Sequence, residues 1–232
     1  LASSSAASDV YKRQDRDLSK KKRRGRHSGG VAIYIRNDLA STTDTQLSFT
    51  NGAVEIIATH SKIDNLLLVT VYRQPDDSAH GRPSSANEFK HAITALKRAI
   101  HNLEYTPDII IGGDFNLPNI SWPECLLTEG CAKDERDMIE ILREFTNDLL
   151  LTQIVREPTH YQGSTLDLVF TNNDSLIHSH EILPTPLSVS HHQVVNIYSQ
   201  YKSPKLLSDV EENPRLSPFD NLNFHSKDVD WE

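Results

Sequence analysis

The sequence predicts an α/β domain, because short apolar strands alternate with two amphipathic helices along most of its 232 residues. Two further observations support this class. Some strand-like runs are almost continuously apolar, as expected for strands buried on both faces. Both helical segments carry their apolar residues on a single face. The apolar content of 37% and charged content of 24% are typical of a globular protein, and no apolar run is long enough to span a bilayer.

The first half of the domain predicts three strands and one helix. The strands are expected in GGVAIYIRNDL (29–39), AVEIIATHSK (53–62) and NLLLVTVYRQP (65–75), which are rich in β-branched and aromatic residues. A helix follows over 85–100. Ser85 is its predicted N-cap, and Glu88 three residues later completes a capping box. Its apolar stripe is Phe89, Ile93, Leu96 and Ile100.

The second half begins with a short buried strand in PDIIIGGDFN (107–116). A second helix is predicted over 134–149, with Met138, Ile141, Leu142 and Phe145 on its apolar face. Short strands are then expected in LTQIV, TLDLVFTN, SHEILP and HHQVVNIYSQ. The two cysteines, Cys125 and Cys131, match no zinc pattern and predict free thiols.

Both ends of the chain differ from this domain. Residues 1–14 resemble the translation of a sequencing adapter, so we expect the protein's own sequence to start near residue 15 and this segment to form no helix or strand. Residues 15–201 are expected to form the domain, and the polar, proline-containing residues 202–232 a linker. The net charge is −8 although KKKRRGR (20–26) carries six positive charges. That run predicts a nuclear signal, a phosphate-contacting loop or an ordinary solvated loop.

The residues with the clearest chemical meaning follow the strand at 107–116. Asp114 and Asn116 are two apart, so on an extended chain their side chains point the same way. A carboxylate that accepts a proton from water and an amide that donates to an oxyanion suit a phosphate ester. An ordinary turn after a strand is the alternative. Asp167 in a strand-like run is either a solvent-facing acid or an inward catalytic one, and Tyr72 ends a buried strand where its phenol can donate to a phosphate.

Five motifs occur in one order: GGVAIYIRNDL, VYRQP, GGDFNLPNISW, PTHYQGSTLDLVFTN and PLSVSHH. In this they resemble the endonuclease domain of non-LTR retrotransposons, of the jockey and CR1-like kind, within the endonuclease/exonuclease/phosphatase superfamily. The resemblance covers residues 15 to about 201. It implies a DNase I-like four-layer α/β sandwich, with two mixed sheets face to face and helices outside. It also implies Mg²⁺-dependent hydrolysis of DNA, with Mn²⁺ as the alternative ion, whose nick primes reverse transcription.

The resemblance also implies the residues of a catalytic site. Tyr72 matches the tyrosine that contacts the scissile phosphate, and Asp114 matches the carboxylate that activates water or steadies the leaving group. Asn116 matches the amide partner of Asp114 at the phosphate. Asp167 matches the acid before the last strands, with a role in catalysis and metal binding, and His192 matches the histidine that stabilises the transition state or orients the nucleophile.

Three further positions complete the expected site. Thr159 and Arg73 are expected to contact phosphate or DNA. His191 stands where the family motif Ser-Asp-His carries an aspartate, so it is the doubtful member of the metal set. The family's asparagine and main metal-binding glutamate, expected on earlier strands, have no match upstream. The opening strands are therefore expected to be missing.

Three functions remain open from the sequence. The first is the DNA endonuclease of a retrotransposon, with DNA as substrate. Element RNA and a reverse transcriptase domain would be its partners in the full-length protein, and the nucleus its location. The second is a catalytically dead remnant or binding module, favoured by His191 and the absent glutamate. The third is a small-molecule phosphoesterase of the same superfamily.

Overall fold

The computed structural model describes residues 10–13, 31–35, 42–43, 47–61, 65–76, 85–122, 124–185 and 190–199. The basic run at 20–26 and the linker expected at 202–232 lie outside these ranges. Within them, no helix has the length and apolar character needed to cross a bilayer.

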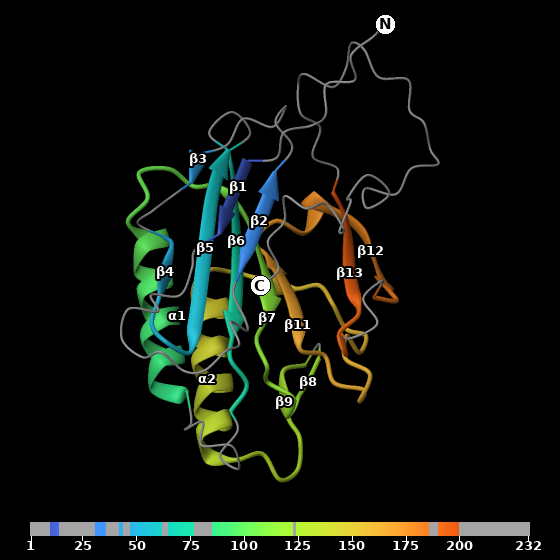
Figure 1. Cartoon of the computed structure of the whole chain (residues 1–232). Coiled ribbons are helices and arrows are strands. Elements are labelled where there is room, and N and C mark those ends of the chain that lie inside the picture. The colour runs from blue at the N-terminus through green and yellow to red at the C-terminus, as the bar shows by residue number, and fades with distance from the viewer. Residues whose placement is uncertain are drawn as a thin grey trace, which may run out of the picture.

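The centre of the domain is a mixed sheet of seven strands (Figure 1). Its strands run in the order β10-β11-β7-β6-β5-β3, and β4 also pairs with β5. Only β6 and β7 are parallel, and every other neighbouring pair is antiparallel. The strands are β3 (Thr42–Thr43), β4 (Phe49–Thr50), β5 (Val54–Ser61), β6 (Leu66–Arg73), β7 (Asp108–Asp114), β10 (Thr152–Gln153) and β11 (Asp167–Thr171).

Two helices, α1 (Ala86–His101) and α2 (Lys133–Asp148), cover one face of this sheet (Figure 1). The whole predicted stripe of α1 is buried. On α2 the buried set includes Ile139, whereas Ile141 packs only at the edge of the core. The capping box predicted for α1 is wrong. Ser85 is the N-cap residue, but its side chain makes no cap bond and instead accepts a hydrogen bond from Arg73 at 2.6 Å.

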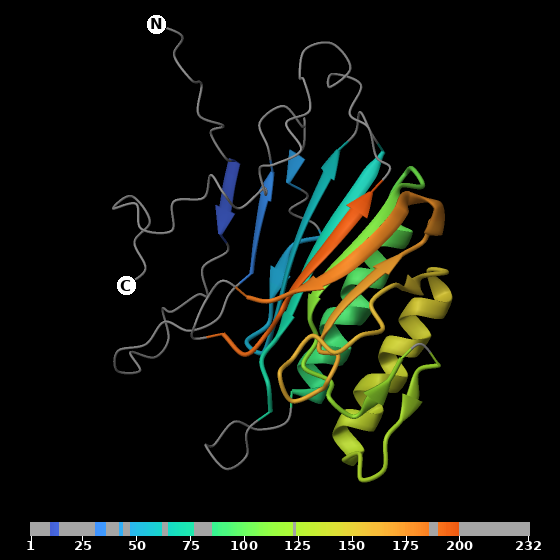
Figure 2. The same cartoon turned by 90° about the vertical axis from the view of Figure 1, so that its right-hand side faces the viewer.

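The remaining strands form three two-stranded sheets. Strand β12 (Ile177–Leu183) follows the short 3-10 helix η3 (Asp174–Leu176) and pairs with β13 (Val194–Ser199). Figure 1 shows this β12–β13 hairpin on the right and the two helices on the left, and Figure 2 looks onto the hairpin from its own side. The other two pairs are β8 (Ile120–Ser121) with β9 (Leu126–Leu127), and β1 (Val10–Arg13) with β2 (Ala32–Ile35).

Strand β1 corrects one expectation, because it lies in the segment 1–14 that was expected to form no strand. Its backbone pairs with β2 from Val10 opposite Ile35 to Arg13 opposite Ala32. The α/β class is confirmed. Of the four layers expected, the described residues supply the helical layer, the mixed sheet and the strands of β12–β13, without a second helical layer.

Candidate active site

The site is built where β7 ends. Gly113, just before Asp114, has φ +146°. A Cβ atom built at Gly113 would lie 1.8 Å from the carbonyl oxygen of Val71 on β6. Only glycine at this position therefore lets the end of β7 approach β6 so closely. Gly113 therefore fixes where the carboxylate of Asp114 leaves the sheet.

Strand register brings three of the expected residues into one row. Tyr72 on β6 pairs with Asp114 on β7, and Asp114 pairs with Asp167 on β11. Directly paired residues point to the same face, so all three leave the sheet on the side opposite the helices. The row continues to Glu55 on β5, which pairs with Tyr72 and is fully buried. Glu55 was not predicted as a site residue, because only the pairing of β5 with β6 places this acid beside the expected site.

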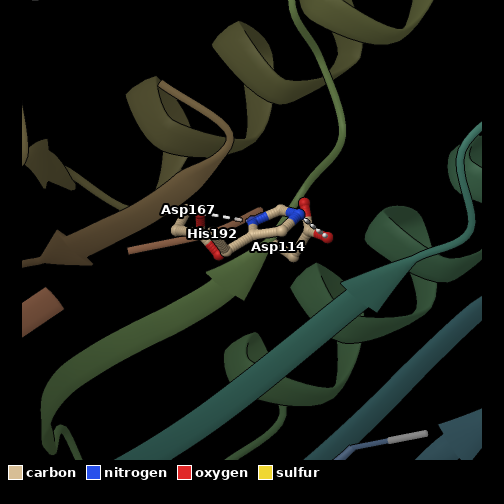
Figure 3. A group of neighbouring side chains, drawn as sticks. All are labelled: Asp114, Asp167 and His192. Carbon is tan, nitrogen blue, oxygen red and sulfur yellow. Dashed lines mark hydrogen bonds and ion pairs between the residues drawn. The ribbon is translucent and has the colours of Figure 1, made fainter. Parts of the chain in front are cut away.

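His192 joins this row from the segment just before β13 (Figure 3). Its Nδ1–H donates to Oδ2 of Asp167 at 2.9 Å, and its Nε2 lies 3.9 Å from Oδ2 of Asp114. The backbone holds this position. The N–H of Gln193 donates to the carbonyl of Thr159 at 2.7 Å, and His192 forms a β-bridge with His160. The imidazole is thus held with Nδ1 facing Asp167 and Nε2 facing Asp114.

Asn116 supports Asp114 more closely than expected. Its backbone N–H donates to Oδ1 of Asp114 at 3.0 Å, and its side-chain amide donates to Oδ2 at 2.8 Å. The same amide nitrogen donates to the carbonyl of Arg73 at 2.7 Å. Both amide hydrogens are therefore used inside the protein, so Asn116 holds the carboxylate of Asp114 rather than presenting a free donor to a phosphate.

The electrostatics of the three groups are coupled. Burial raises the pKa of Asp114 from 3.8 to about 6, helped by the negative charge of Asp167 and opposed by His192 and the two bonds from Asn116. The hydrogen bond to Asp167 raises the pKa of His192, and both carboxylates add to this against the effect of burial. Near neutral pH the site thus combines an ionisable carboxylate with an imidazole that favours its protonated form.

The donor set of these three residues suits a divalent cation. One ligand atom from each of Asp114, Asp167 and His192 lies within 4.8 Å of the others. Carboxylates and imidazole together suit Mn²⁺ and related ions, and the two carboxylates alone suit Mg²⁺. His191, the doubtful member of the expected metal set, lies outside this group. Its exposed ring contacts Tyr161 and His160 instead, with ring centroids 4.7 and 6.1 Å away.

Arg73 and Thr159 are both almost completely buried beside the site, and Arg73 also lines the pocket next to Asn116 and His192. Arg73 follows Tyr72, and alternation along β6 turns its side chain to the helix side, where it is 2% exposed. Thr159 is fully buried, and its Oγ1 accepts hydrogen bonds from the N–H groups of Leu166 and Asp167 at 3.0 and 2.9 Å. Both residues therefore shape the backbone of the site.

Tyr72, Asp114 and Asp167, with His192 beside them, are called the catalytic row below. A pocket of about 430 Å³ opens beside this row. Asn116 and His192 line it together with His160, Gln162 and Glu135. Burial, with the nearby imidazoles of His192 and His191, lowers the pKa of His160, so its ring stays neutral near physiological pH. This pocket gives a substrate access to Asn116 and His192 on one side.

The mixed sheet brings two carboxylates and a histidine, Asp114, Asp167 and His192, together at one edge, a set of groups that suits phosphoester hydrolysis. Residues 66–196, more than half of the chain, match the family model described as endonuclease-reverse transcriptase. The chain belongs to this family, which confirms the resemblance seen in the sequence. By that resemblance it falls among the metal-dependent nucleases and phosphodiesterases.

Two solved structures are similar to the chain. One is the endonuclease domain of TRAS1, a telomere-specific non-LTR retrotransposon, with 21% identity and a TM-score of 0.47 over 73% of this chain and 72% of that one. The other is the human Nocturnin catalytic domain with bound sulfate, with 15% identity and a TM-score of 0.43 over 72% and 62% of the two chains. No curated protein sequence matches the chain.

Proposed function

We propose that this domain is a DNA endonuclease of a retrotransposon, which hydrolyses a phosphodiester bond with a divalent metal ion. The observation that carries the proposal is the placement of His192 between two carboxylates. Its Nδ1 is bonded to Asp167, and its Nε2 faces Asp114 across 3.9 Å. A carboxylate and an imidazole opposed in this way can divide the work of proton acceptance and charge stabilisation in hydrolysis.

Each residue has a distinct part in this proposal. Asp114, with a pKa of about 6, is ionised at neutral pH and accepts a proton from the attacking water or steadies the leaving group. His192 in its protonated form donates from Nε2 to a non-bridging phosphate oxygen as negative charge develops there. Asp167 holds the imidazole in this orientation and favours its protonated form. Tyr72, in register with Asp114, is the proposed second donor to the phosphate.

The metal ion would be held by the carboxylates of Asp114 and Asp167, beside the protonated imidazole of His192, which has no free nitrogen lone pair to offer it. When bound, such an ion supplies a positive charge that stabilises the phosphate oxygens. We propose Mg²⁺ as the ion, with Mn²⁺ as the alternative, because the described donor set contains two carboxylates.

Family membership supports a proposal for the wider setting of this activity. We propose that DNA is the substrate, that the nick primes reverse transcription, and that the active protein works in the nucleus. Residues 15–201 would form the nuclease, and residues 202–232 would lead towards a reverse transcriptase domain that copies the element RNA.

A nicking assay tests the proposal. The chain is incubated with supercoiled plasmid in Mg²⁺, Mn²⁺ or EDTA, and relaxed circles are counted by gel electrophoresis. The proposal expects metal-dependent nicking that is lost in His192→Ala. Hydrolysis of an inositol polyphosphate with no nicking would replace the endonuclease by a small-molecule phosphoesterase of the same superfamily.

A second candidate is a module that binds DNA without cutting it. His191 favours this candidate, because it stands at the family's aspartate position and its ring packs on Tyr161 instead of joining the metal group. Retention of DNA in a gel-shift assay, with an intact plasmid at all metal concentrations, would support binding without hydrolysis.

A further inference from the structure

Arg73 lies behind the catalytic row and is almost completely buried, with 2% of its surface exposed. Its guanidinium bonds to the turn that follows Asp114. Nε donates to the carbonyl of Phe115 at 2.8 Å, and one terminal nitrogen donates to the carbonyl of Asn116. Arg73 on β6 therefore donates to two successive carbonyl groups in the turn that follows β7.

The other terminal nitrogen of Arg73 is anchored on the opposite side. It donates to Oγ of Ser85 at 2.6 Å and pairs with Asp76 at 3.1 Å. Asp76 in turn accepts the backbone N–H of Ser85 at 2.9 Å. These bonds explain why Ser85 does not cap α1 with its own side chain. The start of α1 and the turn after Asp114 are tied to a single guanidinium.

This turn needs such support, because Asn116 adopts φ +49°. Asparagine enters this left-handed region more readily than most residues other than glycine, and the contacts around Asn116 stabilise it there. Asn116 is bonded at both ends to Arg73. Its carbonyl accepts from the guanidinium, and its side-chain amide donates to the backbone carbonyl of Arg73 at 2.7 Å. The same amide then reaches Asp114 at 2.8 Å.

We propose that Arg73 is a positioning residue, which sets the orientation of the Asp114 carboxylate by clamping Asn116 in its left-handed conformation. The proposal deepens the hydrolytic function above and rests on it for its catalytic meaning. Arginine is required because its planar guanidinium serves several acceptors in fixed directions, whereas the ammonium of lysine is a single point of charge.

The protein offers a matched control in Arg143. This residue also donates to a main-chain carbonyl, that of Cys125 at 2.8 Å, and also bonds a carboxylate, Glu140 at 2.6 Å. Cys125 has φ +54°, so the clamped residue is again left-handed. Neither residue lies on the strands that carry the catalytic row. Arg143→Met therefore removes a similar contact, made by a more exposed side chain, elsewhere in the domain.

The direct test observes Asn116 by ¹⁵N NMR, without any need for activity. Its side-chain amide signals are assigned by their loss in Asn116→Ala. In Arg73→Met these signals are expected to shift, and their hydrogen exchange to speed up at least tenfold, because one anchor of the turn is gone. Arg143→Met is expected to leave them unchanged.

Stability must be separated from positioning in this test. If Arg73→Met does not melt cooperatively, Arg73→Lys is used, since it keeps a charge beside Asp76 but cannot reach all the acceptors. A folded Met variant, or failing that a folded Lys variant, with unchanged signals and exchange at Asn116 would overturn the proposal.

Catalysis provides a second readout once nicking is established. Arg73→Met is expected to lower kcat at least tenfold with little change in KM, at a temperature well below its Tm. In the Asn116→Ala background the same substitution is expected to cost less than threefold, because its effect passes through Asn116. Equal losses in both backgrounds would contradict the proposal, whereas an intact plasmid with the wild-type chain would contradict only the endonuclease function.

Discussion

Replacing Asp114 by asparagine should stabilise the metal-free protein. Burial and the neighbouring charge of Asp167 raise the pKa of Asp114 from 3.8 to about 6, so its ionised form is disfavoured in the folded state. That rise corresponds to about 3 kcal/mol at neutral pH. The side chain is 18% exposed, so solvent screens only part of this. Asparagine keeps the shape but weakens the bonds from Asn116 by about 1 kcal/mol. The net gain is therefore about 1–2 kcal/mol.

The stability gained by Asp114→Asn should increase with pH. Below pH 3.8 the carboxyl of Asp114 is protonated in both the folded and the unfolded chain, so its contribution to stability is fully present. As the pH rises through about 6, the folded state loses that contribution, because ionisation is easier in the unfolded chain. Asp114→Asn should therefore have the smaller advantage near pH 4 and the larger one above pH 6.

Thermal unfolding in EDTA at pH 4, 5, 6 and 7.5 measures the effect. A gain of 1–2 kcal/mol corresponds to a Tm increase of roughly 3–6 °C for a chain of this size. The surface substitution Asp137→Asn, at a residue paired only with Lys133, is the control and should change Tm little. A lower Tm for Asp114→Asn at pH 7.5, or a gain that shrinks as pH rises, would refute the reasoning.

Three other substitutions are predicted from single contacts. Gly113→Ala should destabilise the domain by more than about 3 kcal/mol in urea unfolding or prevent folding, because its Cβ would meet the Val71 carbonyl at 1.8 Å. Gly130→Ala is the control, and it should cost about 1 kcal/mol because the space around Gly130 is open. Thr159→Val should cost about 1–3 kcal/mol by the same assay, because one buried and one partly buried N–H group lose their acceptor. A loss below about 0.5 kcal/mol would show that these N–H groups do not depend on Thr159. His191→Asp should raise the plasmid nicking rate, and a fall would mean that position 191 is not the family's aspartate site.

The helices and the local catalytic motif were predictable because they depend on short-range patterns. Spacing of three and four residues placed Phe89, Ile93 and Leu96 on one buried face of α1, as the structure confirms. Asp114 likewise follows a short buried strand in the sequence and stands at the end of β7 in the structure.

Other features of the site depend on which strands pair, and a single sequence does not contain that information. Alternation along β6 puts Tyr72 and Arg73 on opposite faces, but only the sheet order shows that Tyr72 faces the catalytic row. The role of Ser85 was misjudged because a local capping pattern competed with a buried guanidinium from a distant strand. Glu55 was not predicted either, because only the register between β5 and β6 shows that it lies beside Tyr72.

The most direct test of the account is whether a metal ion binds beside His192. Mn²⁺ is added in small steps while the imidazole C–H signals of the histidines are followed by NMR, because a bound paramagnetic ion broadens only nearby signals. The account predicts that the His192 signals broaden first and that Asp114→Asn together with Asp167→Asn removes this preference. Equal broadening of all histidines, or earlier broadening at His178 and His180, would contradict a metal-dependent centre at Asp114, Asp167 and His192.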